Sequence, residues 1–116
     1  MDDSTVVIAG AARTAMGGMN GALSGMAATQ LGAESIRAAL ARSGIAPDAV
    51  DEVIMGCVLP AGLKQAPARQ AALGAGIPKS AGCTTINKVC GSGMKALMFA
   101  HDQLKAGTNR IMVAGG

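Results

Sequence analysis

The sequence has almost no aromatic residues: it contains one Phe and neither Tyr nor Trp. Half of its 116 residues are hydrophobic, so any core must be built mainly from aliphatic side chains, Met and Ala. The 17 glycines allow helices and strands to approach one another closely. This composition favours a layered α/β protein over a coiled coil, and the length is typical of one domain.

The sequence also lacks clustered charge and long apolar runs. Its net charge is +3, and its basic residues are scattered without interleaved aromatics, which argues against a nucleic-acid partner. No apolar stretch reaches the roughly 20 residues that a membrane-spanning helix needs, so no membrane partner is expected. The N-terminal stretch MDDSTVV is acidic and unlike a secretory signal.

Cysteine is scarce as well, with Cys57, Cys83 and Cys90 the only three in the chain. The odd number and the absence of CxxC spacing argue against a disulfide framework and against a zinc site. We therefore expect free thiols, no bound metal and a reducing, cytoplasmic location.

Short β-branched runs alternate with helical patterns along the chain. Strands are predicted at residues 5–10, 51–59, 83–88 and 110–116. Helices are predicted at about 26–42, 66–76 and 91–107. The order β-α-β-α-β-α-β predicts an α/β fold with a mainly parallel sheet covered on both faces. Because the sequence ends directly after a predicted strand, we expect the natural chain to continue.

Cys90 stands between the third predicted strand and the third predicted helix. In open α/β sheets the chemistry lies at the carboxyl ends of the strands. The free N–H groups and positive dipole end of the helix favour thiolate over thiol there. Gly91 and Gly93 would leave the approach to the sulfur open, and the same N–H groups could hold an oxyanion. This pattern is typical of acyl transfer through a thioester.

Two other interpretations of this segment stay open on the residues alone. Cys90 could be a small buried side chain beside a tight turn, or the glycines could form a bare anion-binding turn. The sequence CGSG matches neither the Walker A loop nor GxGxxG. GALSG (21–25) is not the GxSxG turn of a hydrolase.

The other chemically capable residues are predicted to be structural. His101, the only histidine, lies eleven residues beyond Cys90, about 16 Å along a helix, whereas a general base must come within about 3 Å. Cys57 and Cys83 fall in predicted strands among apolar neighbours and are expected in the core. The third helix is expected to bury a Met-rich stripe formed by Met94, Leu97, Met98, His101 and Leu104.

The segment NKVCGSGMKA (87–96) resembles the nucleophile motif of the thiolases, in particular those of the acetoacetyl-CoA type. Three further segments resemble the same family: AARTAMGGMNGALS (11–24), VDEVIMGCVLPAG (50–62) and PARQAALGAGIP (67–78). The sequence departs from the family at Ala15, where proline is usual, and at GLKQAPARQ (62–70), where GQGQNPARQ is common. Neither departure touches the cysteine motif.

The resemblance implies a thiolase-like layered fold of two similar α/β halves. Residues 1–116 would form part of the first half, with the loop domain and the C-terminal domain absent. Cys90 would be the catalytic nucleophile and take an acyl group from acyl-CoA as a thioester. Attack by a second, deprotonated acetyl-CoA would then give acetoacetyl-CoA and CoA, and thiolysis is the reverse. The Cys90 amide would contribute to an oxyanion hole.

The resemblance also implies partners and missing parts. The partners would be acetyl-CoA, acetoacetyl-CoA and CoA as substrates, with no resident cofactor, in a homotetramer that pairs the 83–88 strand with its twofold mate. The activating histidine (GHP) and a second cysteine (CxGG) would lie downstream, so the 116 residues alone are expected to be inactive. The alternatives are a longer-chain 3-ketoacyl-CoA thiolase and a non-catalytic α/β anion-binding module.

Overall fold

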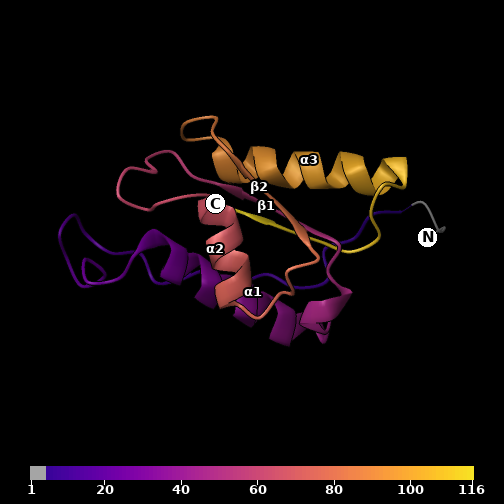
Figure 1. Cartoon of the computed structure of the whole chain (residues 1–116), viewed down its shortest axis with the longest axis horizontal. Helices are drawn as coiled ribbons and strands as arrows, with labels where there is room; N and C mark the ends of the chain where they lie inside the picture. The colour runs from indigo at the N-terminus through magenta and orange to yellow at the C-terminus, as the bar shows by residue number, and fades with distance from the viewer. Residues whose placement is uncertain (1–4) are drawn as a thin grey trace.

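The computed structural model describes residues 5–116, and the acidic residues 1–4 lie outside the described part (Figure 1). The strands are β1 (Glu52–Gly56), β2 (Gly82–Ile86) and β3 (Met112–Gly115). The helices are α1 (Ala28–Ser43), α2 (Pro67–Gly74) and α3 (Ser92–Ala106), with a 3-10 turn at Pro47–Ala49. Within residues 5–116, no helix is long and apolar enough to cross a membrane. The predicted α/β class is confirmed.

All three strands run parallel, in the order β2-β1-β3. The connection through α2 moves from β1 to one neighbour, and the connection through α3 crosses back over β1 to the other. Both crossovers are expected to be right-handed, and they run in opposite directions along the sheet. Their helices, α2 and α3, therefore lie on opposite faces. Figure 1 shows this arrangement, with α3 on one side and α1 with α2 on the other. The central strand is therefore covered on both faces, which explains why its Val53 and Ile54 are fully buried.

Small residues let the two helices on one face approach closely. A Cβ added at Gly32 of α1 would lie 3.1 Å from the Cβ of Ala71 in α2. A Cβ at Gly74 of α2 would lie 3.1 Å from the Cβ of Ala33 in α1. The core on this side is built from aliphatic residues and alanine, as the composition predicts: Ala33, Ile36, Leu40, Val50, Val53, Ala71, Ala72, Ala75, Ile77 and Ala81.

The prediction of a strand at residues 5–10 is wrong. These residues pair with no strand in the described part of the chain, and Val7 and Ile8 are exposed. A β-branched run becomes a strand only where an edge satisfies its backbone groups. Residues 5–10 pair with neither outer edge of the sheet, at β2 or at β3. The run instead leads to Gly10, which packs so closely on α1 that an added Cβ would lie 2.7 Å from the Ala39 carbonyl oxygen.

The buried face predicted for α3 is also wrong. The helix covers the sheet with Ser92, Ala96 and Ala100, which recur every four residues and are buried. The expected stripe lies largely outside this contact: Met94, Leu97, Met98 and His101 are exposed, and Leu104 is half-buried. Hydrophobicity alone therefore misassigned the face, because the short distance between helix and sheet admits only small side chains.

Asp51 fastens the start of β1 to the start of β3. Its Oδ2 accepts hydrogen bonds from the backbone N–H groups of Arg110 (2.8 Å) and Ile111 (3.0 Å). Its own N–H donates to the Ile111 carbonyl at 2.9 Å. The two hydrogen bonds to the carboxylate lower the pKa of Asp51.

Asp51→Ala should lower the free energy of unfolding at pH 7. Because the pKa of Asp51 is lower in the folded state than in the unfolded chain, its charged form stabilises the fold above the usual value of about 3.9. That stabilisation is lost as the pH falls through the folded-state pKa. The difference between variant and parent should therefore shrink towards pH 3 in urea unfolding curves. Asp48→Ala, in the 3-10 turn, is the control. If Asp51→Ala lowered the free energy of unfolding equally at pH 7 and near pH 3, a stabilising role for the charged Asp51 carboxylate would be contradicted.

Candidate active site

Cys90 lies where the sequence predicts it, after the carboxyl end of β2 and before the first residue of α3. Its side chain is exposed, which excludes the interpretation of Cys90 as a small buried residue. Gly91 is the residue that caps the N-terminus of α3. The backbone turns tightly before the helix, where Lys88 and Cys90 form an isolated β-bridge.

The Cys90 loop (residues 87–91) has an unusual backbone conformation. Val89 has a φ of 48°, in the left-handed region that β-branched residues rarely adopt. Such a conformation costs about 1–3 kcal/mol and persists only where the surroundings impose it. The side chain of Asn87 accepts a hydrogen bond from the Val89 N–H at 2.8 Å. The Ser92 hydroxyl accepts one from the Lys88 N–H (2.8 Å) and donates one to the Val89 carbonyl (2.6 Å).

Gly56, the last residue of β1, allows the first turn of α3 to reach the sheet. A Cβ at this position would lie 2.6 Å from the Cβ of Ser92 and 2.8 Å from its carbonyl carbon. By contrast, a Cβ at Gly91 or Gly93 would meet no atom closer than 3.5 Å. Glycine is therefore sterically required at Gly56 in β1 rather than at the two positions beside Cys90. Sequence analysis missed this role of Gly56. A glycine inside a predicted strand was the available signal, since it often marks close backbone approach.

The other two thiols lie in different surroundings. Cys83 is half-buried in β2, packs against the core as expected and directs its Sγ to the Ala81 carbonyl oxygen at 3.6 Å. Burial raises the pKa of the Cys83 thiol. Cys57 was predicted within a strand, but it follows the end of β1 and is only half-buried. Its N–H donates to the Ile86 carbonyl at 2.9 Å.

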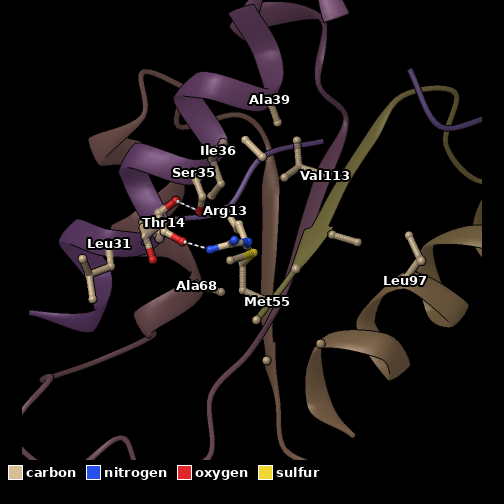
Figure 2. A pocket seen from close by; sticks show the side chains of 18 of the residues that line it. Arg13, Thr14, Leu31, Ser35, Ile36, Ala39, Met55, Ala68, Leu97 and Val113 are labelled. Atoms are coloured by element: carbon tan, nitrogen blue, oxygen red, sulfur yellow. Dashed lines mark hydrogen bonds between the residues drawn. The ribbon is translucent and has the colours of Figure 1, made fainter. Parts of the chain in front are cut away.

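An open cavity of about 610 Å³ lies between α1, the sheet and the first turn of α3 (Figure 2). Figure 2 shows Arg13, Ser35 and Met55 around it, and Arg13 Nη1 donates to the Thr14 carbonyl at 2.9 Å. Cys57 borders the cavity, whereas Cys90 is not among its lining residues. The exposed thiol of Cys90 therefore does not line this cavity.

Within the described residues, His101 does not lie close enough to act as a general base for Cys90. His101 is about half exposed, and its Nδ1 lies 3.1 Å from Asp102 Oδ1. Because α3 is continuous from Ser92 to Ala106, the helical rise still separates His101 from Cys90 by about 16 Å. Within residues 5–116, no group of three or more His, Cys, Asp or Glu side chains could hold a metal ion.

Residues 6–116 match the family model described as thiolase, N-terminal domain. The chain belongs to the thiolase family. It is 59% identical over 111 residues to acetyl-CoA acetyltransferase 2 of Arabidopsis thaliana, covering 96% of this chain and 28% of that protein. The acetyl-CoA acetyltransferase of Cupriavidus necator is 56% identical over the same shares.

A solved structure supports the same assignment. The Acat5 thiolase from Ascaris suum, in complex with coenzyme A, is 41% identical and has a TM-score of 0.91 over 92% of this chain and 28% of that one. The thiolase-like fold is therefore confirmed. This thiolase chain spans slightly more than a quarter of the length of the relatives that it matches.

Limited iodoacetamide treatment near neutral pH should label Cys90 before the other two thiols. Cys90 is exposed at the start of a helix, whereas Cys83 is half-buried with a raised pKa and Cys57 is half-buried. Peptide mapping at low extents of reaction would measure the order. Faster labelling of Cys57 or Cys83 would remove the case for Cys90 as an activated nucleophile.

Proposed function

We propose that the protein containing this thiolase chain is an acetyl-CoA C-acetyltransferase that forms acetoacetyl-CoA from two acetyl-CoA molecules, or catalyses the reverse thiolysis. The observation that carries the proposal is the exposed Cys90 in a strained loop at the start of α3. Relatives above 50% identity are named acetyl-CoA acetyltransferase, which favours this reaction over the longer-chain thiolase and the non-catalytic anion-binding module.

In the first half-reaction, the Cys90 thiolate attacks the carbonyl carbon of acetyl-CoA. The donor proposed for the oxyanion that develops on the carbonyl oxygen is the backbone N–H of Cys90, at the N-terminal end of α3. Collapse of this intermediate expels CoA as a thiolate, which takes up a proton, and leaves an acetyl-thioester on Cys90.

In the second half-reaction, a second acetyl-CoA loses a proton from its methyl carbon, which then attacks the Cys90 thioester. The C–S bond to Cys90 breaks, giving acetoacetyl-CoA and the free thiolate. This step needs a general base, and the geometry of His101 excludes the only histidine of the chain. We therefore expect the base to come from outside residues 5–116.

The proposal extends to assembly and location. We propose a cytoplasmic homotetramer that uses CoA thioesters as substrates, without a metal or a resident cofactor. Support for assembly comes from β2, which is an edge strand. Its residues include no proline and no charge, which are the usual protections of an exposed edge. A twofold axis beside β2 would pair it with an antiparallel copy of itself.

A complete enzyme built on this chain should therefore sediment as a tetramer at micromolar concentration. Thr84→Lys, on the exposed part of β2, should shift it towards smaller species, because the twofold axis brings like charges together. Thr108→Lys, after α3, adds the same charge away from the edge and serves as the control. A monomeric parent protein, or equal effects of both substitutions, would contradict pairing through β2.

Residues 1–116 alone should not catalyse thiolysis. We define the chimera as this chain followed by the remaining part of the Cupriavidus necator relative, and we expect it to consume acetoacetyl-CoA in the presence of CoA. A positioned general base contributes about 10²–10⁴-fold, and the short chain lacks it together with most substrate contacts. Cys90→Ala should abolish turnover by the chimera and its labelling by radioactive acetyl-CoA.

Cys57→Ala serves as the matched control and should retain both turnover and labelling. Labelling without turnover in the chimera would mean that the halves do not assemble a second-step site. An unlabelled but folded chimera would overturn the proposed function. Turnover by the purified 116-residue chain that disappears with Cys90→Ala would show that the necessary base lies within it.

A further inference from the structure

The loop that carries Cys90 is held from both sides by side chains that have no assigned role. On one side, Asn87 Oδ1 accepts the Val89 N–H at 2.8 Å, while its Nδ2 lies 3.4 Å from the Val58 carbonyl oxygen. Asn87 thus links the Cys90 loop to the segment that leaves β1. Both contacts end on backbone atoms, so they fix the course of the chain rather than the position of another side chain.

On the other side, Ser92 closes the loop from within the first turn of α3. Its side chain is buried, with only 4% of the residue exposed. The hydroxyl accepts from the Lys88 N–H at 2.8 Å and donates to the Val89 carbonyl at 2.6 Å. Both partners lie within two residues before Cys90, and backbone N–H groups of Gly91 and Ser92 also donate to the Lys88 (3.0 Å) and Val89 (3.2 Å) carbonyls. Loss of the hydroxyl would remove its two bonds from this turn and loosen the backbone that sets the position of the sulfur.

Packing fixes Ser92 in turn. Its Cβ lies where a side chain at Gly56 would stand, only 2.6 Å from a Cβ built at that position. Val89, in contrast, is 64% exposed, so core packing does not explain its left-handed backbone. The hydrogen bonds from Asn87 and Ser92 are the contacts of the described chain that hold Val89 from either side.

We propose that Asn87 and Ser92 are positioning residues for the Cys90 nucleophile. Their hydrogen bonds hold Val89 at positive φ, and this conformation places the Cys90 thiol for attack on the thioester carbonyl. The inference rests on the proposed function. It adds two residues to the catalytic arrangement without giving either of them contact with the substrate.

The test measures acetylation of Cys90 by acetyl-CoA in the chimera, together with kcat and KM for thiolysis. Asn87→Ala and Ser92→Ala should each lower the acetylation rate and kcat by about tenfold to a hundredfold, because an error of about 1 Å in position has effects of this size. KM should change little, since neither side chain is proposed to bind CoA. Asn87→Ser retains an oxygen that can accept the Val89 N–H and should recover part of the rate.

A substitution at Val89 separates positioning from general stability. Glycine adopts positive φ without strain, so Val89→Gly should restore part of the acetylation rate lost in Ser92→Ala. If Ser92 only filled space beneath α3, a change at the exposed Val89 would restore nothing. Alkylation of Cys57 by iodoacetamide in the same samples provides an internal control and should stay constant.

The outcomes distinguish failure of this inference from failure of the proposed function. An unsubstituted chimera that acetyl-CoA does not label would overturn the function. Normal labelling of the parent with unchanged rates in Asn87→Ala and Ser92→Ala would overturn the positioning role alone. The positioning role would also be overturned if Val89→Gly failed to restore the acetylation rate lost in Ser92→Ala and Cys57 alkylation rose in the same samples.

Discussion

The arrangement around Cys90 depends on one close contact, between the end of the central strand and the first turn of α3. Gly56 has no side chain, so the backbone and Cβ of Ser92 occupy the space where one would lie. This contact sets the distance between the first turn of α3 and the sheet. The Ser92 hydroxyl is hydrogen-bonded to Lys88 and Val89, so the residues before Cys90 are positioned relative to the same contact. The position of Cys90 thus depends on a glycine more than thirty residues earlier in the chain.

The same short distance explains how a chain with one aromatic residue builds its layers. Where helix and sheet approach closely, only small side chains fit between them, and α3 buries Ala96 and Ala100. The larger Met94, Leu97 and Met98 then remain on the exposed surface of the described chain. On the opposite face, glycine and alanine bring α1 and α2 together in the same way. Close packing of small residues therefore replaces the bulk that aromatic side chains usually supply.

Among the three cysteines and the histidine, Cys90 is the residue whose surroundings suit the proposed chemistry. Cys90 is exposed at the start of a helix, whereas Cys83 packs against the core and His101 lies about three helical turns away. The cavity beside α1 borders Cys57 and Arg13 instead of Cys90. Under the proposed function, Cys90 without a neighbouring base could accept an acyl group but could not complete the condensation. The chain spans about a quarter of the length of its relatives.

The sequence by itself determined the alternation of strands and helices, the place of Cys90 between β2 and α3, and, through the motif NKVCGSGMKA, the family. These features are local: turn residues, periodicity and a short motif encode them within about fifteen residues. Only the tertiary structure decided that residues 5–10 form no strand, that α3 buries its alanines, and that Gly56 and Ser92 meet. Each of these depends on which edge is free and how closely two layers approach, and distances between segments far apart in the chain leave no local pattern.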